Sequence, residues 1–319
     1  MSEPLSAPSA GTPCAAPRHA AAFFASPAAL VAQIVPVVRA GLDRGVPVAL
    51  ALPPEIARAV GAALGGLDRV TVLDHPDDPA GRCGQTMAVR LAARLRELAG
   101  DGPVSLVAAH DSRFDGPDGR FWVELEAAFN VVLAGTASDL RCFYPEQPLH
   151  RAVTDGTLRN HPALVLDGEL RPNPLHRPPR EVLAEIPVPP PALLGPPDLV
   201  LVVESARLSD IRGRVEAALI GAGYARARAE DVVFAVNEIT TNAVHHGAPP
   251  AELHMWVVER ACVFEVHDRG RLDDPLPGLR PPVSTQRSGW GVWIARQTCS
   301  ALHVWSDRHG THVRMHTAA

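Results

Sequence analysis

A carboxylate, a carboxamide and two histidines stand close together near residue 240. Residues 237–247 read NEITTNAVHHG. Because a helix advances about 100° per residue, Glu238, Asn242 and His245 share one stripe, with His246 at its edge. An Asn oxygen can ligate a hydrated Mg2+ and its phosphates, and a Glu can orient or deprotonate a nucleophile. A solvated polar face is the alternative, and this stretch alone does not separate the two.

Three further segments carry groups that a phosphate-bearing ligand could use. Asp268 and Gly270 end an expected strand, where a carboxylate can accept a hydrogen bond from an exocyclic amine and the glycine lets the chain turn. Gly289 and Gly291 open an expected helix, whose free N–H groups can approach an anion. Thr311 begins the last expected strand. Taken singly, each segment is as well explained by an ordinary turn or helix start.

The composition excludes several kinds of chemistry. All 30 basic residues are arginine, so the lysine of a Walker-type phosphate loop or of a Schiff base is absent. The net charge of -5 comes without a basic block, so direct nucleic-acid binding is not expected. No apolar run is long enough to span a membrane, the start does not resemble a secretion signal, and the five cysteines are scattered. These features predict a cytoplasmic protein without a membrane segment.

Apolar periodicity predicts alternating helices and strands as far as residue 145. The expected helices are 28–45, 56–67, 87–100 and 121–135, and the expected strands are 46–52, 70–74, 104–110 and 140–145. Short apolar strands between helices are typical of a parallel sheet covered on both faces. We therefore predict an α/β domain over 19–177, preceded by a disordered tail over 1–18.

The last third of the chain has a different order of elements. The expected strands are 198–204, 251–258, 261–268 and 311–316, and the expected helices are 209–223 with a Ser-Asp cap, 229–247 and 290–304. Strands that follow one another beside helices predict an α+β two-layer sandwich over 198–319. The proline-rich stretch 178–197 predicts an extended linker without regular structure.

The order of these motifs resembles the ATP-binding domain of the GHKL superfamily, the Bergerat fold. Within it, the stretch TTNAVHHG at 240–247 resembles the TNAVxHG version of the anti-sigma-factor serine kinases. The resemblance implies that Glu238 acts as a base or orients water, that Asn242 contacts Mg2+ and that Asp268 recognises adenine. It places the ATP lid at 271–288. The implied contacts to ATP are those of Asn242, His246, Asp268, Gly270, Gly289, Gly291 and Thr311.

One residue of the lid departs from the pattern of that family. Leu272 stands where the second glycine of Asp-x-Gly-x-Gly is usual. A side chain at a position that often needs unusual backbone angles is expected to stiffen or reshape the lid. We therefore expect Leu272 to limit turnover rather than ATP affinity.

The N-terminal region resembles the MEDS sensory domain, named for methanogens, methylotrophs and a dichloromethane regulator. The matching stretches include CFYP at 142–145 and LRNHPALV at 158–165. The resemblance implies a degenerate RecA-like fold that receives an unknown small-molecule signal. Residues 81–84 read GRCG where the family has Gly-Arg-Asn-Pro, so an inherited ligand contact is not expected there. His19, Cys142 and His161 are candidates for sensing, with ordinary packing and loop roles as the alternative.

The combined expectation is a two-domain regulator that phosphorylates a partner protein with ATP and Mg2+. The resemblance implies an anti-sigma-factor antagonist with a STAS fold as the substrate, and a sigma factor as a further partner. A switch that binds ATP and a partner without phosphotransfer is the alternative. A histidine kinase is not expected, because a proline-rich stretch rather than a long dimerisation helix precedes the ATP-binding motifs. The oligomeric state stays open, with a homodimer among the options.

Overall fold

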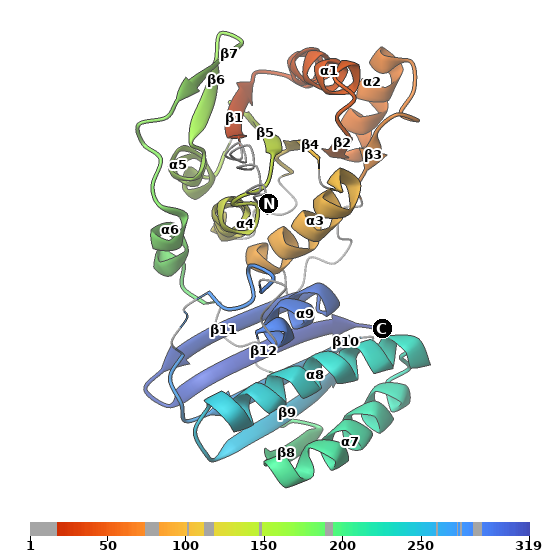
Figure 1. The fold of residues 1–319 in the computed structure, drawn as a ribbon, viewed down its shortest axis with the longest axis vertical. Coiled ribbons are helices and arrows are strands. Elements are labelled where there is room, and N and C mark those ends of the chain that lie inside the picture. Colours follow the sequence, from red (N-terminus) through yellow and green to blue (C-terminus); the bar gives the residue numbers. More distant parts are fainter. Residues whose placement is uncertain are drawn as a thin grey trace, which may run out of the picture.

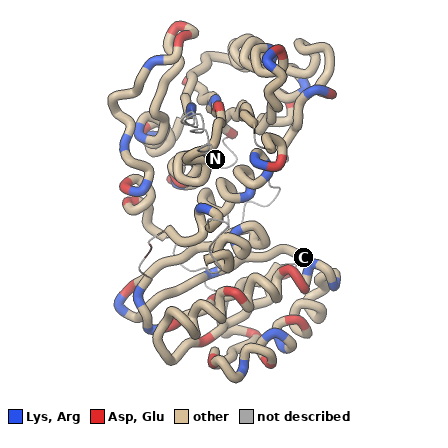
Figure 2. The backbone as a smooth tube through the Cα atoms, viewed as in Figure 1, with Lys and Arg blue, Asp and Glu red and all other residues tan. Residues whose placement is uncertain are grey.

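The computed structural model contains two regions stacked along its long axis, each built on its own sheet (Figure 1). It describes residues 18–73, 83–100, 102–111, 118–146, 149–188, 194–259, 261–272, 274, 276–282 and 289–319. The expected tail thus lies almost wholly outside the described residues. Arg, Asp and Glu are interspersed over both regions (Figure 2). Among the described helices, none combines the length and the apolar character that crossing a membrane requires.

The N-terminal region is a seven-stranded sheet in the order β3-β2-β4-β5-β1-β6-β7. All neighbouring strands are parallel except the last pair, β6 and β7, which is antiparallel. The strands are β1 (Arg18–Phe24), β2 (Val48–Ala51), β3 (Thr71–Val72), β4 (Val104–Ala109), β5 (Ser138–Pro145), β6 (Ala163–Leu166) and β7 (Glu169–Pro172). The helices are α1 (Pro27–Asp43), α2 (Pro54–Leu64), α3 (Gly84–Ala99), α4 (Arg120–Val132), α5 (Arg151–Asn160) and α6 (Pro179–Glu185).

Two hydrophobic clusters cover the two faces of this sheet. Successive residues of a strand point to opposite faces, so Leu106 packs with α3 and α4, whereas Val107 packs with α1 and α2. Cys142 and Phe143 of β5 divide between the same two clusters. The expected α/β domain with a parallel sheet covered on both faces is therefore confirmed.

The C-terminal region is an antiparallel five-stranded sheet in the order β11-β12-β10-β9-β8, with its helices on one face (Figure 1). This confirms the expected α+β two-layer sandwich. The strands are β8 (Leu199–Val203), β9 (Ala251–Val258), β10 (Ala261–Asp268), β11 (Ala301–Asp307) and β12 (Gly310–Ala318). The helices are α7 (Leu208–Gly221), α8 (Arg226–His246) and α9 (Trp290–Thr298), with a short 3-10 turn, η2 (Ser205–Arg207), before α7.

Three sequence expectations about single elements are wrong. The helix expected over 290–304 ends at Thr298, because Cys299 is extended and Ala301 begins a strand that pairs with β12. The Ser-Asp cap is absent, since Ser209 and Asp210 lie inside the first turn of α7, which begins at Leu208. The stretch expected to be free of helix contains α6, which two prolines at its start favour, because the first turn needs no N–H donors.

Candidate functional site

A cavity of about 380 Å³ opens in the C-terminal region between α8 and the ends of its strands. Asn242 and His246 of α8, Asp268 of β10 and Thr311 of β12 supply polar groups to its lining. Apart from these residues and the charged Arg271 and Asp274, its walls are largely apolar, which suits a flat ring held by a few polar contacts. The apolar walls include Ile239, Val266, Val292, Val304 and Val313.

Asp268 is nearly buried, with 6% of its surface exposed, at the end of β10. Its Oδ1 accepts hydrogen bonds from the backbone N–H of Ala248 (3.1 Å) and of Gly270 (2.6 Å). Within the described part of the chain, both bonds reach the same oxygen. Oδ2 is thereby left for a donor in the cavity, which is the role that an exocyclic amine of a base would fill.

Thr311 lies directly opposite Asp268 in the pairing of β10 with β12. Its hydroxyl donates to the carbonyl oxygen of Gly270 at 3.1 Å and shares a 3.0 Å hydrogen bond with Ser306. Gly310, just before it, has a φ of +139° and passes so close to the Asp268 carbonyl that a Cβ there would collide with it. The start of β12 therefore fixes the turn that carries Asp268 and Gly270.

The polar stripe of α8 is divided between the cavity and the packing of α9. Asn242 and His246 line the cavity, whereas Glu238, one turn earlier, does not. Glu238 instead lies against the first turn of α9: a Cβ on Gly291 would come within 2.8 Å of its Oε2 and 3.4 Å of Asn242 Nδ2. Gly291 is thus needed for close approach of the two helices, and Gly289, in the left-handed region at φ +95°, lines the cavity.

The predicted site residues therefore fall into two groups. Those around the cavity are Asn242, His246, Asp268, Gly289 and Thr311. Those that shape it without lining it are Glu238, Gly270 and Gly291. Sequence reasoning missed Ser306, whose role depends on the pairing of β11 with β12.

The described part of the expected lid contributes Arg271, Leu272, Asp274 and Pro277 to the cavity wall. Leu272 is not among the non-glycine residues with positive φ, which in the described part are Asp167 and Glu259. Its N–H donates to Ser306 Oγ at 3.3 Å. Leu272 therefore lies outside the left-handed region that favours glycine, and its effect on turnover stays a prediction. Residues 273, 275 and 283–288 of the expected lid, and Gly81 and Arg82, lie outside the described residues.

The lid also packs on the N-terminal region. Leu276 and Leu279 are buried in the same hydrophobic cluster as residues of α3 and α4, and Trp293 of α9 packs against that cluster. Arg296 of α9, with 1% of its surface exposed, donates to Gln85 of α3 at 3.0 Å. The lid and α9, which both contribute other residues to the cavity wall, therefore contact the N-terminal region, a connection that was not predictable from the sequence.

Two family models match separate parts of the chain. Residues 18–162 match the family model described as MEDS, the MEthanogen/methylotroph, DcmR Sensory domain. Residues 201–317 match the model described as a histidine kinase-like ATPase domain. No curated protein matches the chain.

A solved structure, that of the RsbU and RsbW domains of Rv1364c from Mycobacterium tuberculosis, is similar at 20% identity and a TM-score of 0.30. That match covers 39% of this chain and 32% of the other, so the chain spans about a third of the length of that protein.

Proposed function

We propose that this chain, which joins a MEDS sensory domain to a histidine kinase-like ATPase domain, is a serine/threonine kinase of the anti-sigma type. Its substrate would be a hydroxyl of an antagonist protein with a STAS fold, and a sigma factor would be a further partner. The observation that carries the proposal is the cavity where Asn242, His246, Asp268 and Thr311 meet. A small-molecule signal at the MEDS domain would set the activity.

The residues of the cavity fit ATP. The Oδ2 atom of Asp268 would accept a hydrogen bond from the adenine amine, with Val266 and Val313 as apolar wall. The N–H groups at the start of α9, which Gly289 leaves uncovered, would face the phosphates. The Asn242 side chain offers one neutral oxygen, which suits a Mg2+ that keeps its phosphate and water ligands. Bound Mg2+ would neutralise charge on the phosphates.

Glu238 lies one helical turn from Asn242. It would accept the proton of the attacking hydroxyl as a general base, or orient that hydroxyl. Its place beside Gly291 puts it at the start of α9, next to the expected phosphate position. Transfer would then depend mainly on positioning of the two reacting groups, as is usual for phosphoryl transfer.

Sensory control is supported by the packing of the lid. Leu276 and Leu279 belong to the hydrophobic cluster of the MEDS domain. A rearrangement of α3 or α4 would therefore displace the lid, which forms part of the wall of the ATP cavity. Allosteric control requires two distinct sites, here the signal site of the MEDS domain and the ATP cavity, and one element whose conformation depends on both. The lid would be that element.

A switch that binds ATP without phosphotransfer has one observation in its favour, since Glu238 does not line the cavity. The two functions are separated by a single-turnover assay with labelled ATP, Mg2+ and STAS proteins encoded near the gene. A kinase labels one of these proteins. Mg-ATP binding without labelled partner or released phosphate would instead indicate the switch.

Three variants of α8 sharpen that assay. Asn242→Ala should weaken Mg-ATP binding at least about tenfold, and Glu238→Ala should keep binding and lose phosphotransfer. Asn237→Ala is the matched control, because Asn237 lies on α8, outside the cavity lining, and accepts a hydrogen bond from Arg212. Full phosphotransfer by Glu238→Ala would remove Glu238 from the mechanism.

A further inference from the structure

Four buried side chains of the MEDS domain converge from four elements of its fold. They are His19 of β1, Glu126 of α4, Cys142 of β5 and His161, directly after α5. One ligand atom of each lies within 4.8 Å of all the others. Sequence reasoning named the two histidines and the cysteine as sensing candidates but not Glu126, which lies in an apolar helix (FWVELEAAF) 16 positions before Cys142.

The hydrogen bonds around the cluster fix which histidine nitrogens face it. Asn130 uses its amide N–H groups on two backbone carbonyls, so its Oδ1 accepts from His19 Nδ1 at 3.0 Å. His161 Nδ1 lies 2.8 Å from the carbonyl oxygen of Thr157, which can only accept. Both Nδ1 atoms therefore carry hydrogen, and a neutral ring then presents the lone pair of Nε2 to the cluster.

Glu126 is oriented in the same way. The Tyr144 hydroxyl donates to its Oε1 at 2.7 Å. Its Oε2 faces the two histidine rings, at 3.0 Å from His19 Nε2 and 3.6 Å from His161 Nε2. This pattern, in which a partner outside the cluster orients the two histidines and the glutamate, is the one found around metal ligands.

Hydrogen bonding alone does not satisfy the cluster. With neutral rings, two lone pairs and a carboxylate oxygen meet, and only the Cys142 thiol has a proton to share among them. A protonated His19 would pair with Glu126. His161 Nε2, which has no hydrogen-bond partner among the described residues, would still lack one. A buried polar atom without a partner is costly, so the geometry calls for a cation.

Four of the six distances among the ligand atoms are close to those around a tetrahedral ion, and the remaining two lie within 4.8 Å. Metal–ligand bonds of about 2.0–2.3 Å to His, Glu and Cys place neighbouring ligand atoms about 3.4 Å apart in a tetrahedron. The Sγ of Cys142 lies 3.4 Å from His19 Nε2 and 3.6 Å from Glu126 Oε2, and the two histidine–glutamate distances are 3.0 and 3.6 Å.

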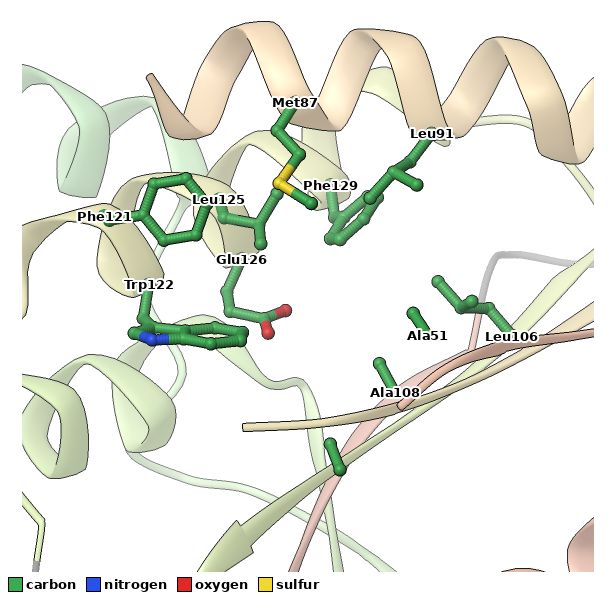
Figure 3. Close-up of a pocket in the computed structure, with 11 residues that line it drawn as sticks. Ala51, Met87, Leu91, Leu106, Ala108, Phe121, Trp122, Leu125, Glu126 and Phe129 are labelled. Atoms are coloured by element: carbon green, nitrogen blue, oxygen red, sulfur yellow. The ribbon is translucent and has the colours of Figure 1, made fainter. Parts of the chain in front are cut away.

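We propose that His19, Glu126, Cys142 and His161 form a binding site for one divalent transition-metal ion of the zinc class. A thiolate and a carboxylate would balance its two positive charges, so the buried site would be neutral. The ion would link two neighbouring strands of the sheet to α4 and α5. Glu126 projects into a small cavity whose other lining residues are apolar, among them Trp122 and Phe129, so the site would be shielded from bulk water (Figure 3).

Cobalt provides the direct test. Full-length protein, purified without a histidine tag and stripped of metal, is titrated with Co2+ and followed by absorption. The proposal expects one equivalent bound, with visible bands of a tetrahedral ion and a near-ultraviolet band of sulfur-to-cobalt charge transfer. Zn2+ should displace the cobalt and abolish both. Failure of the stripped, folded wild-type protein to bind either ion at micromolar concentration would overturn the proposal.

Variants assign the ligands. Cys142→Ser should lose the charge-transfer band, whereas Cys299→Ser, a buried thiol outside the cluster, should keep it. Asn130→Leu, which removes the partner of His19 Nδ1, should weaken cobalt binding about 10- to 100-fold. A charge-transfer band that survives Cys142→Ser would show that the ion sits elsewhere and would also overturn the proposal. The wild-type titration decides the question if a variant does not fold.

Discussion

Arg296 Nη2 donates a 3.0 Å hydrogen bond to Gln85 Oε1 and so joins the two domains. The same guanidinium donates from Nε to the Pro277 carbonyl in the lid and from Nη1 to the Leu302 carbonyl of β11, each at 3.0 Å. Burial lowers the pKa of Arg296, although Cys83 and Glu124 partly offset that effect. One buried side chain thus holds the lid, the ATPase sheet and helix α3 of the MEDS domain together.

Replacing Arg296 should uncouple the two domains. Arg296→Ala removes the hydrogen bonds to Gln85, to the lid and to β11, and loss of such a buried charged group costs about 3 kcal/mol or more. In calorimetry we expect one unfolding transition for the wild type and two for the variant. Mg-ATP should raise the temperature of only one of those two transitions.

Arg228→Ala is the control for that measurement. Arg228 donates to the carbonyl oxygens of Thr298 (2.9 Å) and Ala318 (3.1 Å), both within the ATPase domain. It should therefore keep a single transition at a lower temperature. A single transition in Arg296→Ala, shifted as a whole by Mg-ATP, would contradict the coupling assigned to Arg296.

Glu124 should make the stability of the protein depend on pH near neutrality. Its carboxylate accepts from Gly84 N at 2.6 Å and from Gln85 Nε2 at 3.0 Å, at the start of α3. Burial, together with the nearby Cys83, raises the pKa of Glu124 to about 7 against the opposing effects of His303, the Gly84 N–H and Arg296. Between pH 4.5 and 7 the folded state therefore binds more protons at Glu124 than the unfolded state does. Its contribution to stability falls as pH rises through that window.

The comparison of wild type with Glu124→Gln isolates this effect. Across pH 4.5 to 7, the free energy of unfolding of the wild type should fall relative to the variant by at most about 3 kcal/mol. The difference between the two proteins is used because burial also lowers the pKa of His303 to about 4. That shift makes the protein more stable as pH rises from 4 to 6.5, which opposes the effect of Glu124. Parallel curves of unfolding free energy against pH for the two proteins would contradict the assignment.

The sequence predicted the parts of the site that depend on local pattern. Helical spacing placed Asn242 and His246 close together on one helix, and Asp268 was expected to end an apolar strand, as it does, whereas their contacts with ATP rest on the resemblance and stay a prediction. Strand β11 was missed because a short apolar run fits helix and strand equally well, and its pairing with β12 decides between them. That choice depends on residues beyond the run itself.

Contacts between distant parts of the chain were beyond prediction. Gln85 and Arg296 are 211 positions apart, and neither is distinguished in the sequence from other polar residues on helices. Glu126 is similar, because the sequence does not show which side chains a carboxylate in this apolar helix meets. Its role follows only once the sheet brings His19 and Cys142 side by side, as their β1 and β5 pairing does.

Gly291 should be essential for the contact between α8 and α9. A Cβ at this position would lie 2.8 Å from Glu238 Oε2 and 3.1 Å from Glu238 Cβ, so Gly291→Ala must separate the helices or displace the carboxylate. We expect a loss of about 1–3 kcal/mol in the free energy of unfolding and weaker Mg-ATP binding, measured by denaturation and calorimetric titration.

Gly213→Ala provides the matched comparison. Gly213 lies in α7, where an added Cβ meets nothing within 4 Å, so alanine should stabilise the protein by about 0.5–1 kcal/mol. Equal effects of the two substitutions would mean that α9 tolerates a side chain at Gly291.

Leu272 should act as a wall of the ATP cavity rather than as a restraint on the lid. It has no positive φ, its N–H is held by Ser306 Oγ, and its side chain lines the cavity. Leu272→Gly removes apolar contact with the nucleotide and frees the backbone, so ATP affinity should fall severalfold. The rate of phosphotransfer from bound ATP should stay unchanged, because no strain is released.

Leu272→Met, which keeps an apolar side chain of similar size, should preserve affinity. These quantities are measured by titration and by single-turnover transfer at saturating ATP. A faster transfer step in Leu272→Gly with unchanged affinity would show instead that the side chain holds back closure of the lid.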